Sequence, residues 1–197
     1  MISGTKSLRF GRVSIPNQIY HVTTVTKDRH QYFLNFELSR CLIKSIHTSP
    51  NVETLAYVVM PDHVHWLLKL QSSNVSLSKT LSYVKTRSAG FAFKNFGIKG
   101  LWQKGFHDHA VRGEEDLIKI ARYIVANPVR AGLVRSVRDY SHWDAVWIWV
   151  FIASRAGLFF RSSLRFALQA SSYMERLLVG ASSKSDAIWF CLGLITI

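Results

Sequence analysis

The spacing of hydrophobic residues changes period several times along the first two thirds of the chain. Four stretches rich in β-branched and aromatic side chains have strand periodicity, at residues 18–26, 53–60, 63–70 and 106–112. Three stretches repeat apolar residues at helical spacing, at residues 36–47, 77–95 and 114–126. The pattern therefore predicts the element order βαββαβα.

Only Pro61 and Asp62 separate the second and third predicted strands, so these two strands are expected to form a hairpin. One hairpin within a β–α alternation is typical of a mostly antiparallel sheet with helices packed on it, an α+β ferredoxin-like domain. Asn35 and Ser76 are expected to cap the first two helices. The dipeptide Asn127-Pro128 is expected to end the third helix.

The chain divides by composition into three regions. Residues 1–17 form a basic N-terminal arm that carries Arg9 and Arg12, and residues 18–149 form the expected folded domain. Residues 150–197 are rich in Ser, Ala and Leu and hold no histidine, with one amphipathic helix expected near residues 163–179. This tail has no motif that indicates chemistry, and its role is open.

The charge balance indicates the class of partner. Lys and Arg number 25 against 12 Asp and Glu, a net charge of +13, which favours a polyanion such as nucleic acid. The two cysteines, Cys41 and Cys191, lie far apart and form no CxxC motif, so a reducing cytoplasmic setting fits. The longest apolar runs fall short of the ~20 residues of a membrane helix. A membrane partner is therefore not expected. We expect a cytoplasmic protein that associates with the nucleoid.

Two pairs of alternate histidines are candidates for a metal site. His63 and His65 share one face of the third predicted strand, as His107 and His109 do on the fourth. Two neutral imidazoles so placed can bind one divalent cation, although alternate histidines more often lie at the surface or in packing. His63 and His65 are favoured because they lie between apolar runs, where unpaired polar rings are costly to bury.

The third predicted helix adds a possible nucleophile. Lys119, Tyr123 and Asn127 recur every four residues and line one edge of the helix. Tyr123 can act as a nucleophile and Asn127 can supply a neutral oxygen ligand, but a helical tyrosine is more commonly a packing residue. Arg122 and Arg130 nearby suit a phosphate group.

Further basic and aromatic residues are candidates for nucleic-acid contact. Unpaired strands are usually held by phosphate contacts together with aromatic stacking. The candidates outside the arm and the third helix are Lys85, Arg87, Trp102, Lys104 and His107. Trp102 fits a core position equally well. The chain lacks a P-loop and a GxGxxG motif, so no nucleotide cofactor is expected.

Three linked motifs occur in the order MPDHVHWLL, LWQKGFHDH and ARYIVANPVRAGLV. Together they closely resemble the HUH single-strand transposases and, within that superfamily, the REP-associated tyrosine transposases. The resemblance extends over about residues 18–149. It therefore implies that this region is an HUH transposase catalytic domain.

The resemblance also implies roles for individual residues. His63-Val64-His65 matches the family's motif of two histidines around a bulky hydrophobic residue, whereas Asp108 breaks that match between His107 and His109. The family's nucleophile corresponds to Tyr123. Asn127 stands where related enzymes often carry a Gln ligand, so it would complete a site for Mg²⁺ or Mn²⁺ with His63 and His65.

The implied activity is metal-dependent nicking and rejoining of single-stranded DNA at hairpins, the repetitive extragenic palindromes, through a 5′-phosphotyrosine intermediate. One alternative is a catalytically inactive protein that binds DNA hairpins with the same fold. Another is a metal-dependent hydrolase that releases a free 5′-phosphate. The family includes monomers and homodimers, and the sequence does not favour either state.

Overall fold

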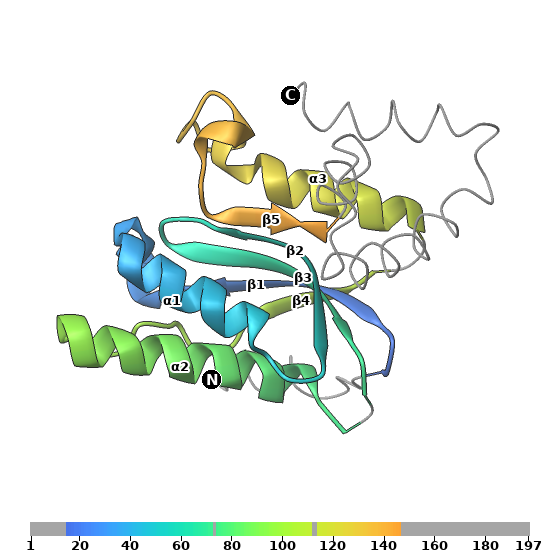
Figure 1. Ribbon diagram of the computed structural model, residues 1–197, viewed down its shortest axis with the longest axis horizontal. Helices are drawn as coiled ribbons and strands as arrows, with labels where there is room; N and C mark the ends of the chain where they lie inside the picture. The colour runs from blue at the N-terminus through green and yellow to red at the C-terminus, as the bar shows by residue number, and fades with distance from the viewer. Residues whose placement is uncertain (1–14, 73, 112–113, 147–197) are drawn as a thin grey trace, which may run out of the picture. The chain divides into compact units, whose positions relative to one another are not determined.

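The computed structural model describes residues 15–72, 74–111 and 114–146 (Figure 1). The chain forms two compact units that meet in sequence between Val111 and Arg112. Arg9, Arg12 and the predicted tail helix lie outside the described residues. The expected catalytic domain, residues 18–149, includes parts of both units and stays a prediction.

The first unit has the predicted order βαββαβ. Its strands form an antiparallel sheet in the order β4-β1-β3-β2. The elements are β1 (Ile19–Val25), α1 (Phe36–His47), β2 (Val52–Val59), β3 (His63–Leu70), α2 (Leu77–Phe96) and β4 (His107–Ala110). This strand order, with its two crossing helices, confirms the predicted ferredoxin-like α+β fold.

The two faces of β3 have different surroundings. Val64, Trp66 and Leu68 point to the face covered by α1 and α2 and belong to the main hydrophobic core. His63 and His65 alternate with them and therefore lie on the opposite face. The hairpin between β2 and β3 closes with Met60 N donating to His63 O at 2.8 Å, as the Pro61-Asp62 connection predicts.

Both helices of the first unit begin at the predicted caps. Asn35 Oδ1 accepts from Leu38 N at 3.0 Å, and Ser76 Oγ accepts from Lys79 N at 3.3 Å. Gly97 ends α2 in the left-handed conformation with φ of 67°, where a glycine avoids steric strain. The local signals thus set the helix ends, and the apolar faces of the helices set their packing against the sheet.

The loop between α2 and β4 is tied to α2 by two side chains. Lys85 Nζ donates to Gln103 O at 3.0 Å and to Gly105 O at 2.6 Å. Trp102 Nε1 donates to Ser88 Oγ at 3.0 Å, and the Trp102 ring packs against the core beside Phe33. Burial lowers the pKa of Lys85 to about 8. Both side chains, expected to contact DNA, are engaged in packing this loop.

The second unit contains α3 (Glu114–Arg130), which is longer than predicted. The prediction that Asn127-Pro128 ends the helix is wrong, since Pro128 lies inside it. A proline has no N–H for the carbonyl of Ile124, four residues back. Asn127 Nδ2 instead donates to Ile124 O at 3.4 Å and to Tyr123 O at 2.8 Å, so the carbonyl keeps a donor.

After α3 the chain forms a 3₁₀ turn, η4 (Val137–Asp139), and a short strand, β5 (Trp143–Ala145). The sequence pattern did not predict this strand. Trp143 Nε1 donates to Val137 O at 2.7 Å and ties the two elements together. Among the described residues, none of the helices combines the length and apolar character that crossing a membrane requires.

We expect Lys85→Met to lower the free energy of unfolding by about 1–3 kcal/mol, because methionine keeps much of the aliphatic stem but leaves the carbonyls of Gln103 and Gly105 without their charged donor. Urea denaturation measures the change. Lys79→Met is the control, because Lys79 is exposed on the same helix and is expected to change stability by no more than about 0.5 kcal/mol. Equal stability of Lys85→Met and the wild type would contradict this role of Lys85.

Candidate active site

The two histidines of β3 lie close together on the face of the sheet opposite α1 and α2. Their ring centroids are 5.0 Å apart and the rings are nearly perpendicular, at 87°. His65 is buried and His63 half-buried. The two-residue period of the strand, fixed by the core packing of Val64, therefore presents both imidazoles on one side.

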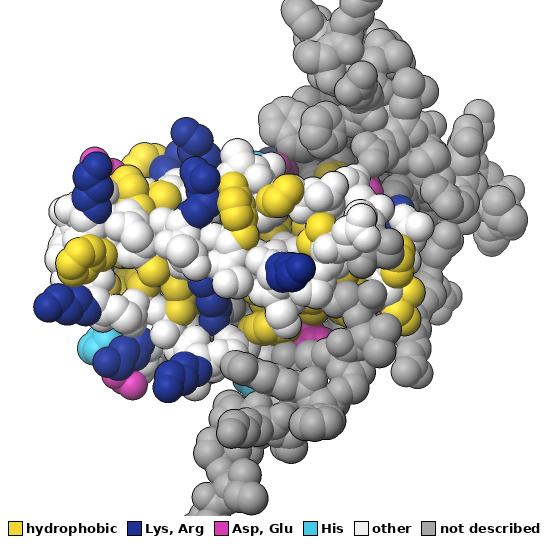
Figure 2. Space-filling model, turned by 90° about the horizontal axis from the view of Figure 1, so that it is seen from below, with side chains coloured by type: hydrophobic (Ala, Val, Ile, Leu, Met, Phe, Trp, Pro, Cys, Tyr) yellow, Lys and Arg dark blue, Asp and Glu magenta, His cyan; other side chains and the backbone are white. Residues whose placement is uncertain are grey.

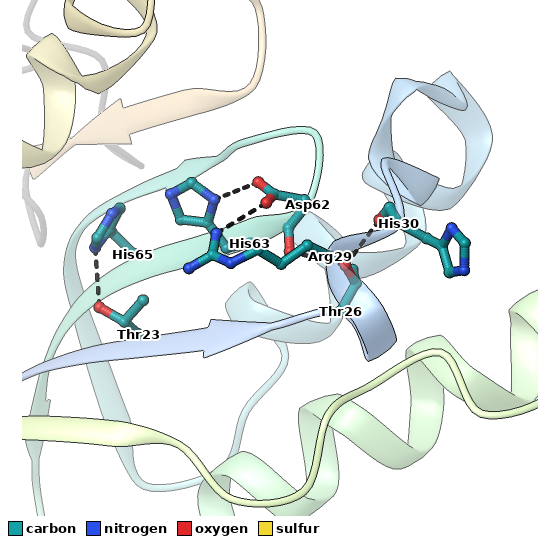
Figure 3. Close-up of polar contacts among 7 residues, drawn as sticks. All are labelled: Thr23, Thr26, Arg29, His30, Asp62, His63 and His65. Atoms are coloured by element: carbon teal, nitrogen blue, oxygen red, sulfur yellow. Dashed lines mark hydrogen bonds and ion pairs between the residues drawn. The ribbon is translucent and has the colours of Figure 1, made fainter.

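Asp62 and Arg29 hold the ring of His63. His63 Nδ1 donates to Asp62 Oδ1 at 2.5 Å, and Arg29 Nη1 donates to Asp62 Oδ2 at 3.0 Å. Figure 3 shows the carboxylate bonded through one oxygen to the imidazole and through the other to the guanidinium. Burial by itself would raise the pKa of Asp62, but the hydrogen bonds and charges of His63 and Arg29 outweigh it and lower the pKa. Asp62 is therefore an ionised acceptor for the Nδ1 proton.

The backbone that carries Arg29 is held in an unusual conformation. Asp28 and Arg29 both have positive φ, at 52° and 53°, which costs on the order of 1 kcal/mol for each such residue. An exposed ion pair such as Arg29–Asp62 contributes only about 0–1 kcal/mol. The ion pair is thus too weak to offset by itself the energetic cost of the two residues with positive φ.

His65 has a different set of neighbours. Its Nδ1 lies 3.0 Å from Thr23 Oγ1 and 3.1 Å from His21 Nε2, both on β1 (Figure 3 draws the Thr23 contact). Burial, with a smaller effect of the nearby His63 and His21, lowers the pKa of His65 to about 3. Burial and then the neighbouring His109 lower the pKa of His21 to about 4. Both rings are therefore neutral at pH 7.

The second histidine pair lies on the same face, two strands away. His107 pairs with Thr23 and His109 pairs with His21 in the register of β4 with β1. Both side chains are exposed. The sheet thus brings His21 beside His65, a neighbour that neither histidine pair reveals by sequence spacing.

The His63–His65 pair fits a divalent cation in its donor chemistry. Imidazole nitrogens suit first-row metals, and metal-bound histidines usually donate their other ring N–H to a carboxylate or another acceptor. Asp62 takes this role for His63. Among the described residues, no three His, Cys, Asp or Glu side chains gather as a metal site. A cation on this pair would therefore need other donor types as its remaining ligands.

In the second unit, Tyr123 and Asn127 are one helical turn apart on α3. Tyr123 is 41% exposed, high for a large aromatic side chain, and the Arg130 guanidinium lies 5.2 Å from the centre of its ring. The Nδ2 atom of Asn127 bonds to carbonyls of its own helix, which leaves Oδ1 as the atom that suits a cation. Arg130 is exposed and Arg122 is half-buried on the same helix.

The remaining residues expected to contact DNA have different surroundings. Arg87 is exposed with its guanidinium 5.4 Å from the centre of the Tyr83 ring, and Lys104 is exposed in the loop after α2. Figure 2, seen from the side of α2, shows Lys and Arg side chains at several places on this face and fewer acidic ones. Lys85 and Trp102 are half-buried and pack the loop after α2, and their contact with DNA stays a prediction.

Four residues around the histidine pair were missed in the sequence: His21, Thr23, Arg29 and Asp62. The alternation of β1 carries a signal for two of them, since His21 and Thr23 alternate with the core residues Tyr20 and Val22. The position of Asp62 directly before His63 could have indicated a contact between the carboxylate and the imidazole. Nothing in the sequence indicates Arg29, because it reaches Asp62 from 33 residues away.

We expect acid to destabilise the fold through His21 and His65. Their folded-state pKa values lie below the ordinary 6.5, so below about pH 6.5 the unfolded chain binds protons that the folded chain does not. The stability is complete above the unfolded pKa and falls by about 1.4 kcal/mol per histidine per pH unit, down to pH 4 for His21 and pH 3 for His65.

Urea denaturation at about pH 7 and about pH 5 measures this loss. The variant His21→Gln/His65→Gln should lose clearly less stability than the wild type over the same interval. His107→Gln, a substitution at an exposed histidine of the same sheet face, is the control and should behave as the wild type. If the double variant loses as much as the wild type, the acid sensitivity arises elsewhere.

Comparison with known proteins gives consistent matches in sequence and fold. The model of the IS200-like transposase family matches residues 14–127. A Haemophilus influenzae protein assigned by name to the REP-associated tyrosine transposases is 28% identical over 136 residues, covering 63% of this chain and 77% of the relative. The REP-associated tyrosine transposase of Escherichia coli is 26% identical over 133 residues, covering 66% of this chain and 78% of the relative.

A solved structure of a REP-associated tyrosine transposase, bound there to a REP hairpin, matches with a TM-score of 0.58 and 27% identity. The match covers 68% of this chain and 80% of that chain. The histidine pair of β3 and Tyr123 of α3 both fall within the residues that the family model matches. Because that match spans more than half of the residues, the chain belongs to the IS200-like transposase family.

Proposed function

We propose that this protein is a metal-dependent transposase that nicks and rejoins single-stranded DNA at hairpins, with Tyr123 as the nucleophile. The observation that carries the proposal is the pair of imidazoles on one sheet face, His63 and His65, each with its Nδ1 in contact with a protein partner. A contact at Nδ1 restricts the ring orientation, and an acceptor there leaves Nε2 to bind a metal, as the Asp62 carboxylate does for His63. Family membership and the hairpin-bound relative support DNA as the substrate.

The proposed reaction exchanges one phosphate ester for another. Tyr123 Oη attacks the scissile phosphorus, a bond forms between them, and the bond from phosphorus to the 3′ oxygen breaks. The tyrosine proton is lost to solvent, and the leaving 3′ oxygen takes a proton from solvent and becomes a hydroxyl. The DNA 5′ end then stays linked to Tyr123, and attack by a 3′-hydroxyl reverses the exchange and joins new ends without ATP.

His63, His65 and Asn127 are the proposed protein ligands of a divalent cation, with Mg²⁺ or Mn²⁺ as the candidates because phosphate oxygens would complete the donor set. When bound, such a cation polarises the scissile phosphate and offsets the charge that develops on it. The neutral state of His65 favours this role, since a protonated imidazole cannot bind a metal. Asn127 would contribute its Oδ1 atom.

The proposed DNA surface uses basic residues. Arg130, beside Tyr123, suits the phosphate that the tyrosine attacks, and Arg122 is a second candidate on α3. Further described candidates in the first unit are Arg87, Lys104 and His107, together with the half-buried Lys85 and Trp102. Phosphate contacts of this kind bind a DNA backbone without reading its sequence.

We expect Tyr123→Phe to abolish a covalent protein–DNA adduct, because phenylalanine lacks the attacking hydroxyl. The full-length protein is incubated with 3′-labelled hairpin oligonucleotides carrying single-stranded flanks, and the adduct is read on a denaturing gel with Mg²⁺, with Mn²⁺ and with EDTA. Wild type should form the adduct only with metal. His63→Ala should reduce the adduct by about 100-fold or more.

Tyr140→Phe is the matched control, since it removes the hydroxyl of another tyrosine of the second unit and should leave adduct formation unchanged. An adduct formed by Tyr123→Phe would assign the nucleophile to another residue. A free 5′-phosphate without any protein-linked species would indicate a metal-dependent hydrolase. Hairpin binding with no cleavage under either metal would indicate an inactive DNA-binding protein.

A further inference from the structure

The Arg29–Asp62–His63 chain is built from two segments that the fold holds together. The backbone of the β2–β3 turn is bound to the loop after β1, because Thr26 donates to Asp62 O through its N–H at 2.9 Å and its Oγ1 at 2.9 Å. Phe33 N donates to Pro61 O at 3.0 Å. These bonds hold the backbone segments that carry Asp62 and Arg29 next to each other.

The Arg29–Asp62 ion pair differs from a second ion pair among the described residues of this unit, Lys69–Glu53. Lys69 and Glu53 pair across β3 and β2 at 3.9 Å, with no histidine in the contact. The Arg29–Asp62 pair is shorter, at 3.0 Å, although 68% of the Arg29 side chain is exposed. An exposed ion pair contributes little to the free energy of folding, and the loop of Arg29 is strained. The Arg29–Asp62 contact is therefore better explained by the position it gives the Asp62 carboxylate than by a gain in stability.

The two histidines differ in how their protons are fixed. Thr23 and His21, the partners of His65, can each donate or accept, so these contacts allow either neutral form of the ring. The carboxylate of Asp62 can only accept, so His63 must carry its proton on Nδ1. The contact with Asp62 therefore fixes Nε2 as the ring nitrogen of His63 that carries the lone pair.

We propose that Asp62 and Arg29 are positioning residues that hold His63 with its proton on Nδ1, so that its Nε2 lone pair would be available to the proposed divalent cation. Asp62 sets the proton position, and Arg29 holds the Asp62 carboxylate through its other oxygen, Oδ2. The inference rests on the proposed metal-dependent function, yet its first consequence concerns the ring of His63 in the metal-free protein. It can therefore be tested apart from catalysis.

The first test reads the proton position by ¹⁵N NMR of the histidine rings in the metal-free, full-length protein near neutral pH. Wild type should show the Nδ1–H form of His63. Asp62→Ala should shift the ring to a mixture of both forms, because its acceptor is gone. Asp62→Asn should retain much of the Nδ1–H form, since the amide oxygen still accepts. An unchanged signal in Asp62→Ala would overturn the proposal.

The second test measures the affinity for Mn²⁺ by titration followed by EPR. Asp62→Ala should weaken binding by about 10-fold or more, and Arg29→Gln should weaken it less, with partial recovery in Arg29→Lys. Glu53→Gln, which breaks the other ion pair, is the matched control and should bind as the wild type. Equal affinities of Asp62→Ala and the wild type would contradict the role of Asp62.

His63→Ala in the same titration separates this inference from the proposed function. If His63→Ala binds Mn²⁺ as tightly as the wild type, His63 is not a ligand and the proposed metal site fails, whatever the NMR result. If His63→Ala weakens binding while Asp62→Ala changes neither the ring signal nor the affinity, the metal site stands and the positioning role is refuted.

Discussion

The antiparallel register of β1 with β3 is the constraint on which the rest of the site depends. It places Thr23 opposite His65 and Val25 opposite His63. A slip of one residue would turn the side chains of one strand to the opposite face, so that histidines would enter the helix-covered core and valines would leave it. The burial of Val64, Trp66 and Leu68 therefore stabilises the histidine geometry as well as the fold.

The local signals in the sequence were sufficient for most of the first unit. The predicted bounds of β3 and α1 agree with the structure, because alternation, a capping asparagine and a nearby proline all act over a few residues. The end of α3 was mispredicted because a side chain replaced the donor that Pro128 lacks. The short strand β5 has too few residues to show a period.

The sequence was enough to propose the ligand candidates, but it did not indicate most of the contacts that support them. His63 and His65 stand out because they lie two residues apart, whereas Arg29 and His21 reach the site from distant segments through the fold. Lys85 and Trp102 illustrate the opposite case, since residue types that suit DNA contact are used to pack a loop. Charge and aromaticity identify what a side chain can do, and burial decides which of these roles it takes.

The Asn127-Pro128 pair has a consequence for the flexibility of the Asn127 side chain. Proline removes a backbone donor and the asparagine amide supplies one in its place, so the two residues act as one element. These hydrogen bonds restrict the rotation of the Asn127 side chain when the helix folds. The side-chain entropy is therefore lost on folding and not on binding of a ligand. The oxygen of Asn127 thus has a preset direction, which a longer and more flexible glutamine would have to adopt on binding.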